Sequence, residues 1–273
     1  MDQLRVLDEV RSWATDDDNI RLVVLTGSFA HGTGAIDDLS DLDIELYVLD
    51  PRPLLEHRDW YRRFGEVLVV EELENPDWHP TRLIYYDEGK IDFMIASIDV
   101  AEGGVGYSRP YRIVTDKDSL GDHLHREADP ESRPPTAREV ETCINWFFAA
   151  ALMWAKAVVR DEPWSAKVRE WEANNQLLQM IQWDHRARHG WDYDTWYLGA
   201  HMREWMDADI VTRLQTCWAD FTMPSMAYAV SASIALFEEV AARVEAALGL
   251  DPFDSGPVRA KVGRTLSLTD LRE

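Results

Sequence analysis

Cysteine, basic residues and long apolar runs are all scarce in this sequence of 273 residues. The two cysteines, Cys143 and Cys217, lie far apart in apolar helical context, so we expect buried free thiols and neither a disulfide framework nor a cysteine metal site. The most apolar stretch, from Trp146 to Val159, is interrupted by Lys156 and so falls short of the roughly 18 residues that span a bilayer. The N-terminal segment lacks a signal-peptide pattern. These absences predict a cytoplasmic location and no membrane segment.

The shortage of basic residues excludes one class of partner. Lys and Arg together number 28 against 50 Asp and Glu, which gives a formal net charge of −22. Proteins that bind nucleic acids neutralise phosphates with clusters of Lys and Arg, and this chain has no such cluster. We therefore expect no nucleic-acid partner. A cationic partner is easier to accommodate, although the same acidity also serves solubility.

The pattern of the chain changes near residues 129–135, where Pro130, Pro134 and Pro135 interrupt regular structure. The first half alternates between helical and extended periods, and the second half is helical almost throughout. We predict domains over residues 1–132 and 133–250, followed by a tail over 251–273. The expected elements are helices over 2–14 and 56–64, strands over 21–26, 41–49, 66–70, 82–86, 91–96 and 111–115, and then helices over 136–160, 165–188, 195–206, 209–221 and 226–248. A Thr136/Glu139 capping box and Gly249 mark two of the helix ends.

Three aspartates carry the most specific chemical signal. Asp41 and Asp43 alternate with Leu42 and Ile44 on a strand, so both carboxylates point to one side while the apolar residues anchor the strand in the core. Asp92, in another alternating stretch, supplies a third carboxylate from a neighbouring strand. Carboxylates are the ligands that Mg²⁺ uses together with substrate phosphates. The three acids can bind two metal ions, or bind one and leave a base.

Gly27 and Ser28 follow the first strand and precede the acidic strand by one loop. The glycine allows backbone amides to approach a phosphate, and the serine hydroxyl can donate to it. An Asp-x-Asp pair alone arises often on solvated strands. The order of strand, Gly-Ser, Asp-Leu-Asp-Ile and Ile-Asp-Phe, however, is similar to the general pattern of the polymerase-beta-like nucleotidyltransferase superfamily.

Within that superfamily the chain resembles the aminoglycoside 6-adenylyltransferases, which include streptomycin-modifying enzymes. The resemblance spans residues 2–248 and is carried by Phe64-Gly65-Glu66, Lys90-Ile91-Asp92, Asp116-Lys117-Asp118, Pro135-Thr136-Ala137-Arg138, Cys143, Asn145, Phe147, Lys156, Arg160, Glu162, Leu177-Leu178, Met180-Ile181 and Trp183.

The resemblance implies an α+β protein with an N-terminal mixed-sheet nucleotidyltransferase domain, a C-terminal helical bundle and an active site in the cleft between them. It implies transfer of AMP from ATP, with Mg²⁺, to a hydroxyl of a cationic aminoglycoside such as the 6-position of streptomycin, and hence antibiotic resistance. By the same resemblance Asp41, Asp43 and Asp92 are the metal-binding carboxylates and Ser28 contacts the triphosphate.

The helical domain offers further candidates. Lys156, on a largely apolar helix, either neutralises triphosphate charge or pairs with a carboxylate, and Lys167 is a second predicted nucleotide contact with a solvated helix face as its alternative. The resemblance places a general base in this domain, and Glu170 and Glu172 are the nearest candidates. Seven of the tryptophans in this half are expected mostly in the core, although their faces could also stack on a base or a sugar. They are Trp146, Trp154, Trp171, Trp183, Trp191, Trp196 and Trp205.

The sequence departs from the family after Gly-Ser, where Phe29, Ala30 and His31 replace the Arg and Asn usual in close members. This departure leaves open a different acceptor, such as a lincosamide or a protein hydroxyl. A binding protein that kept the fold and lost catalysis is the alternative from another class, and the three acids in register speak against it. The chain does not indicate its oligomeric state.

Overall fold

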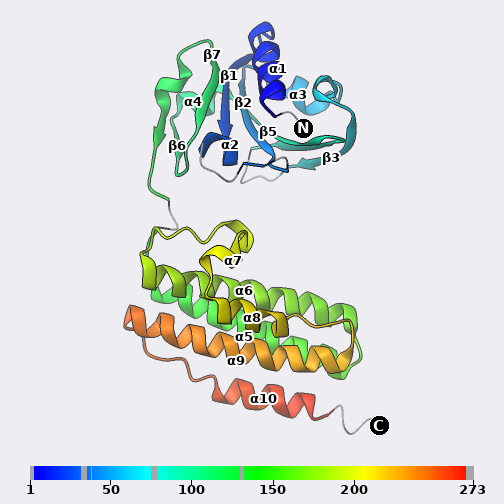
Figure 1. Ribbon diagram of the computed structural model, residues 1–273, viewed down its shortest axis with the longest axis vertical. Helices are drawn as coiled ribbons and strands as arrows, with labels where there is room; N and C mark the ends of the chain where they lie inside the picture. Colours follow the sequence, from blue (N-terminus) through cyan, green and yellow to red (C-terminus); the bar gives the residue numbers. More distant parts are fainter. Residues whose placement is uncertain (1–2, 32–35, 38, 75–78, 130–131, 269–273) are drawn as a thin grey trace. The chain divides into compact units, whose positions relative to one another are not determined.

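A computed structural model describes residues 3–31, 36–37, 39–74, 79–129 and 132–268 of the chain (Figure 1). It divides into two compact units, Met1–Pro130 and Glu131–Glu273. The first unit holds a mixed sheet and the second is helical, so the predicted α+β class is confirmed. Residues 130–131, within the predicted linker, lie outside the described residues.

The first unit contains a sheet, a small strand pair and short helices. Its elements are α1 (Gln3–Asp16), β1 (Ile20–Thr26), α2 (Gly27–His31), β2 (Leu42–Val48), α3 (Arg52–Glu56), the 3-10 helix η1 (Trp60–Phe64), β3 (Val67–Leu73), β4 (Thr81–Tyr86), β5 (Gly89–Ser97), α4 (Ile98–Glu102), β6 (Val105–Tyr107), β7 (Arg112–Asp116), the 3-10 helix η2 (Leu120–His123) and β8 (Leu124–Arg126).

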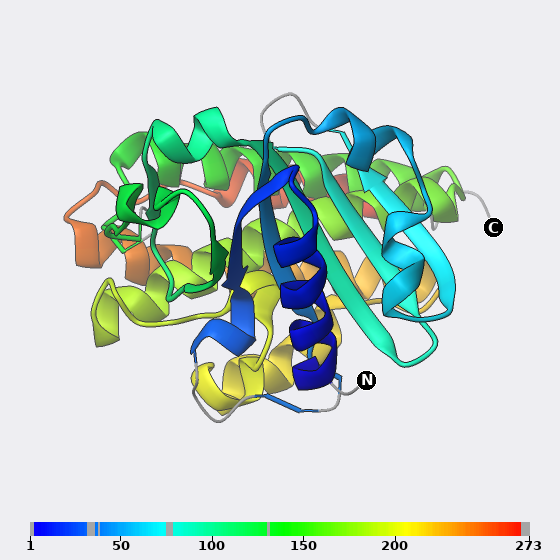
Figure 2. The ribbon, with the colours of Figure 1, turned by 90° about the horizontal axis from the view of Figure 1, so that it is seen from above.

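The large sheet has the strand order β3-β4-β5-β2-β1-β7, and β6 pairs with β8 beside it. Within the large sheet β2 and β5 run parallel, whereas the other pairs are antiparallel. One face is covered by α1 and η1 over a core that includes Val23, Ile44 and Phe93 (Figures 1 and 2). On the other face a smaller core around Tyr47 and Tyr107 covers part of the sheet. The acidic side chains of β2 lie on this second face.

The predicted helix over 56–64 is wrong, because the chain forms α3 and η1 there instead. His57 is extended, with φ −96° and ψ 138°. The Trp60 ring stacks on Trp13 at 5.3 Å between centroids, and its indole N–H donates to the Leu54 carbonyl at 2.8 Å. Burying this aromatic group outweighs the helical pattern of the segment.

The second unit is a bundle of helices. Its elements are α5 (Ala137–Val159), α6 (Pro163–His189), the 3-10 helix η3 (Tyr197–Gly199), α7 (Met202–Trp205), α8 (Ala208–Cys217), α9 (Met223–Leu248) and α10 (Gly256–Leu266). The predicted capping box is present, with Thr136 accepting from the Glu139 amide, and α9 ends at Gly249 in the left-handed conformation. The segment 251–273, expected as a tail, holds α10, in which Val262 is buried against the bundle core.

The predicted helix over 195–206 is broken. Trp196, Leu198 and His201 have φ values of 51°, 51° and 54°, which an α-helix does not allow. Only the short η3 and α7 form in this segment. Local helical periodicity did not reveal these turns, because three of the left-handed residues there are not glycines.

Helix α5 is long and largely apolar. By length and composition it alone among the described helices could cross a membrane, in contrast to our reading of this stretch as too short. It packs in the bundle, however, and 61% of its most apolar window is buried. Cys143 of α5 and Cys217 are buried free thiols, as predicted. The apolar composition is thus accounted for by the core of the second unit.

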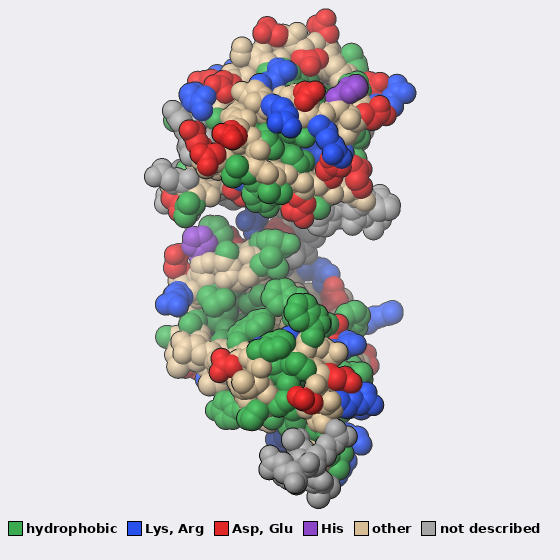
Figure 3. Space-filling model, turned by 90° about the vertical axis from the view of Figure 1, so that its right-hand side faces the viewer, with side chains coloured by type: hydrophobic (Ala, Val, Ile, Leu, Met, Phe, Trp, Pro, Cys, Tyr) green, Lys and Arg blue, Asp and Glu red, His purple; other side chains and the backbone are tan. Residues whose placement is uncertain are grey.

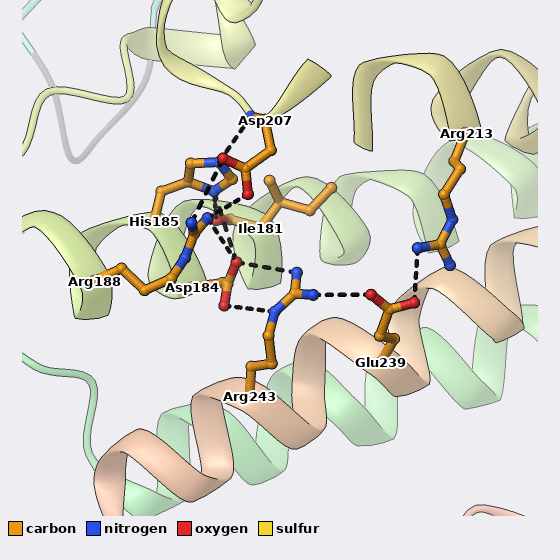
Figure 4. A network of polar contacts seen from close by, with 8 residues as sticks. All are labelled: Ile181, Asp184, His185, Arg188, Asp207, Arg213, Glu239 and Arg243. Carbon is orange, nitrogen blue, oxygen red and sulfur yellow. Dashed lines mark hydrogen bonds and ion pairs between the residues drawn. The ribbon is translucent and has the colours of Figure 1, made fainter. Parts of the chain in front are cut away.

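A buried carboxylate joins three helices of the bundle (Figure 4). Asp184 of α6 is 1% exposed and accepts two hydrogen bonds from Arg243 of α9, at 2.9 and 3.1 Å. Arg188 donates to both Asp184 and Asp207, at 3.1 and 2.7 Å. His185 bridges the Ile181 carbonyl and the Asp207 amide. Such a fully paired network fixes how α6, α9 and the start of α8 pack.

Candidate active site

The three predicted aspartates lie together on one face of the sheet. Asp43 of β2 is the Cα partner of Asp92 on β5, and Asp43 also pairs with Thr26 at the end of β1. Asp41 precedes β2 by one residue, and its carboxylate shares a cation with that of Asp92. The alternation with Leu42 and other core residues holds this strand, so the acids are fixed on the opposite side.

Lys90 is the cation that the two outer acids share. Its Nζ lies 3.0 Å from Asp41 Oδ2 and 2.8 Å from Asp92 Oδ2. Burial lowers the pKa of Lys90, but the hydrogen bonds to Asp92 and Asp41 more than offset this, so the pKa is raised overall. Sequence analysis placed Lys90 in the motif and gave it no role. Lys90 and Asp92 are two residues apart on β5, and this spacing, which places both side chains on one face of the strand, could have suggested the contact.

Asp43 lies beside Asp92 on the neighbouring strand, and in the part of the chain that the structure describes no Lys or Arg forms an ion pair with it. Burial, followed by the charges of Asp92 and Asp41, raises its pKa to about 6. Its carboxylate rests against the backbone of Gly27, which has φ +64°, and a Cβ at that position would lie 1.8 Å from Asp43 Oδ2. Gly27 is therefore required both for the turn that begins α2 and for the approach of Asp43.

Ser28 is half-buried on α2, directly after β1 and beside Gly27. The sequence predicted that Gly27 and Ser28 follow the first strand. In the structure they begin the short helix α2 directly after β1. This placement puts the Ser28 backbone next to the residue that contacts Asp43, as a triphosphate contact beside the acids would require.

The acids continue along the strand. Glu45 follows Asp43 on the same face and lies half-buried between the partners Val24 and Met94. Its Oε2 accepts hydrogen bonds from the Tyr47 hydroxyl, at 2.9 Å, and from the Tyr107 hydroxyl. Burial raises the pKa of Glu45, and the two phenol hydrogen bonds oppose that rise. The alternation of side chains along β2 puts Glu45 on the same face as Asp43, but only the fold brings Tyr107 to it.

In the second unit the predicted lysines differ in their surroundings. Lys156 is exposed on α5, with its amine 4.0 Å from the Met153 sulfur. Lys167 Nζ lies 2.6 Å from Glu170 Oε2 and donates to the Ala219 carbonyl. Lys167 is thus held within its own unit, a role that sequence analysis did not foresee.

The two candidate bases also differ. Glu170 is fully buried, and its Oε1 accepts from the Ala219 amide at 2.5 Å, so this side chain joins α6 to the segment after α8. Glu172 is partly exposed and pairs with Arg169 at 2.6 Å. Of the two, Glu172 has the accessible carboxylate.

Tryptophans of the second unit are less buried than we expected. Trp154 and Trp205 are in the core, but Trp146 and Trp171 are 64% and 56% exposed. Trp171 lies 5.9 Å from the exposed Trp218, measured between ring centroids. Hydrophobic side chains also gather on one face of this unit in Figure 3. These rings are available for stacking, whereas the core is built mainly from aliphatic residues, Phe147 and Phe237.

Comparison with known families shows to which family the chain with this acidic face, formed by Asp41, Asp43 and Asp92, belongs. A sequence model described as streptomycin adenylyltransferase matches residues 2–255, which is nearly the whole chain. The chain belongs to the streptomycin adenylyltransferase family. The predicted resemblance is therefore confirmed.

Several aminoglycoside 6-adenylyltransferases are similar to this chain over most of its length. The aminoglycoside 6-adenylyltransferase of Campylobacter jejuni is 24% identical over 249 residues, which cover 88% of this chain and 86% of that protein. The enzyme of the same name from Bacillus subtilis (strain 168) is 26% identical over 204 residues, covering 69% and 70%. A crystal structure of an aminoglycoside 6-adenyltransferase from Bacillus subtilis aligns with a TM-score of 0.48 and 20% identity, over 96% of this chain and 97% of that one.

A divalent metal is implied by the family, and the residues of the acidic face fit one. Within the described residues no three His, Cys, Asp or Glu side chains are gathered closely enough to form a preformed metal site, and the Lys90 amine pairs with both Asp41 and Asp92. Yet Asp92 Oδ1 is buried without a hydrogen-bond partner among the described residues, and the charged form of Asp43 is destabilised by burial and then by its two neighbours. Hard oxygen donors in this condition suit Mg²⁺ held together with a phosphate group.

Proposed function

We propose that this protein is an Mg²⁺-dependent adenylyltransferase that transfers AMP from ATP to a hydroxyl of an aminoglycoside, with the 6-position of streptomycin as the first acceptor to test. The observation that carries the proposal is the register of Asp43 with Asp92 on parallel strands, beside Asp41, in a chain of this family. Relatives named aminoglycoside 6-adenylyltransferase support the acceptor class. A cytoplasmic resistance enzyme is the corresponding cellular role.

In this proposal Asp41, Asp43 and Asp92 hold the metal, and Gly27 and Ser28 lie along the triphosphate. Mg²⁺, when bound, neutralises phosphate charge and so lowers the energy of the transition state. The acceptor hydroxyl forms a bond to the α-phosphorus, the bond from that phosphorus to the bridging oxygen of the β-phosphate breaks, and pyrophosphate leaves with the bonding pair. The hydroxyl proton passes to a carboxylate, for which Glu170, Glu172 and Asp92 are the candidates.

The residues of this chain then have distinct tasks. Lys90 neutralises Asp41 and Asp92 before the substrate binds. Gly27 gives Asp43 its place beside the backbone. Lys156 and Lys167 stay predicted nucleotide contacts; Lys156 is exposed on α5, whereas Glu170 and Ala219 hold the Lys167 amine.

The experiment is an assay of the full chain with ATP and Mg²⁺ against streptomycin, a second aminoglycoside and a lincosamide. Pyrophosphate release and AMP attached to the acceptor, detected by mass spectrometry, are the two readouts. We expect both with streptomycin and neither in the Asp41→Asn/Asp43→Asn double variant. Turnover of the lincosamide alone would replace the acceptor class, and acceptor binding without turnover of any compound would make the chain a binding protein.

A further inference from the structure

Glu45 is a carboxylate on the acidic face that the metal site does not use. It follows Asp43 by two residues, about 7 Å along the same strand and on the same face. Its neighbours in the sheet, Val24 and Met94, are apolar. The described residues place no Lys or Arg in an ion pair with Glu45, and His79 is a basic side chain whose charge lowers the pKa of Glu45. The carboxylate is thus half-buried without a permanent cation.

Two phenols hold Glu45 in a single orientation. The hydroxyls of Tyr47 and Tyr107 both donate to Oε2, and these two tyrosines are 1% and 9% exposed. Tyr107 is itself packed against Tyr111, with 4.3 Å between ring centroids. Because both donors use Oε2, Oε1 keeps its lone pairs for another donor. A rigid acceptor group of this kind is preorganised for a ligand.

A purely structural role would not require the charge. Removing even part of a carboxylate from water without a cation is unfavourable relative to an apolar side chain of similar volume. Tyr47 and Tyr107 could be satisfied by water or by a neutral amide. The Glu45 carboxylate lies on the same face as Asp41, Asp43 and Asp92, and no described residue donates a hydrogen bond to its Oε1. A cation that arrives with the substrate explains this charge.

We propose that Glu45 binds a positively charged nitrogen of the acceptor through Oε1 and so selects cationic acceptors at the site of nucleotidyl transfer. The proposal rests on the adenylyltransferase function proposed above. Since Oε2 is already occupied, the contact is a single hydrogen bond from an ammonium, or from one N–H of a guanidinium, and not a bidentate pair. Tyr47 and Tyr107 act as positioning residues for this carboxylate.

The test compares wild type with Glu45→Gln, which keeps the size of the side chain and removes its charge. Glu102→Gln is the matched control, because Glu102 is an exposed acid of the same unit. Acceptor affinity is measured by calorimetry without ATP or metal, and kcat and KM are measured in the complete assay. We expect Glu45→Gln to weaken aminoglycoside binding roughly 10- to 100-fold, with the KM for ATP unchanged, and Glu102→Gln to stay within about twofold.

An acceptor with acetylated amino groups completes the cycle, and wild type and Glu45→Gln should bind it equally. Equal binding of the unmodified acceptor by both proteins would overturn the role of Glu45 while leaving the transfer reaction standing. If wild type turns over no aminoglycoside at all, the proposed function itself fails. Should Glu45→Gln not fold, Tyr107→Phe takes its place: loss of one hydrogen bond should weaken acceptor binding about fivefold, and unchanged binding contradicts the proposal.

Discussion

Asp43 of β2 and Asp92 of β5 are Cα partners across a parallel strand pair, so their carboxylates leave the sheet side by side on one face. Residues paired in this way in neighbouring strands point in the same direction. Burial and the two neighbouring charges raise the pKa of Asp43 to about 6. The pair therefore gains from any cation placed between its members, and this condition is the basis of the predictions on the acidic face.

Replacing Asp43 by Asn should separate catalysis from folding. We expect turnover to fall by roughly two orders of magnitude or more, because a carboxylate that holds the metal is lost. Thermal stability should not fall, since the change removes one of three mutually repelling charges. Pyrophosphate release and the melting temperature are the measurements. Normal turnover by Asp43→Asn would refute the two-carboxylate assignment.

Gly27→Ala should disrupt the acidic face from the side of the backbone. The new Cβ would overlap Asp43 Oδ2, and φ +64° is strained for alanine, so we expect a loss of about 1–3 kcal/mol in unfolding free energy together with a loss of activity. Gly249→Ala is the matched control: its φ is +67°, but nothing lies within 4 Å of its Cβ. That variant should lose about 1 kcal/mol and keep its activity. Equal activity of the two variants contradicts the role of Gly27.

Lys90→Met should make the protein more dependent on metal. Without the amine, Asp41 and Asp92 lose their shared cation, and we expect a loss of about 1–3 kcal/mol, less than for a fully buried pair because Asp41 is partly exposed. Addition of Mg²⁺ should then raise the melting temperature of Lys90→Met more than that of wild type, and chelation should reverse the gain. Equal shifts in the two proteins would show that Lys90 and the metal do not share these acids.

Glu170→Gln and Glu172→Gln should behave differently. Glu170 is buried against Lys167 and the Ala219 amide, so we expect its variant to lose about 1–3 kcal/mol of stability. Glu172→Gln should keep its stability and, if this residue is the general base, lower kcat and flatten its pH dependence while nucleotide binding survives. Wild-type kinetics in Glu172→Gln would leave Glu170 and Asp92 as the candidate bases.

His185 should make the stability of the bundle sensitive to mildly acidic pH. Its Nδ1–H donates to the Ile181 carbonyl at 2.8 Å and its Nε2 accepts from the Asp207 amide at 3.0 Å, which satisfies a neutral ring. Burial, partly offset by the Ile181 contact, lowers the pKa of His185.

The unfolded chain therefore takes up a proton first as the pH drops. Stability is full above about pH 6.5 and falls below it, by at most about 1.4 kcal/mol per pH unit. Urea unfolding of wild type and His185→Gln between neutral and mildly acidic pH measures this. The variant should be weaker at neutral pH but lack this part of the slope; identical slopes would contradict the assignment.

The sequence by itself determined the α+β class and the side of β2 on which the acids lie. These follow from local signals: alternation fixes which side of β2 carries Asp41 and Asp43, the capping box starts α5 at Thr136, and Gly249 ends α9. The family resemblance, carried by short motifs along the chain, was also readable without coordinates.

Only the tertiary structure decided which distant side chains meet. Lys90 between Asp41 and Asp92, Tyr107 on Glu45, and Lys167 held by Glu170 and Ala219 all depend on how elements pack. The broken helix over 195–206 and the 3-10 turn at Trp60 arose in the same way, because burial of aromatic rings and non-glycine residues in the left-handed conformation override local helical periodicity. Periodicity reports which face a residue occupies, whereas the partner across that face is set by contacts between segments far apart in the chain.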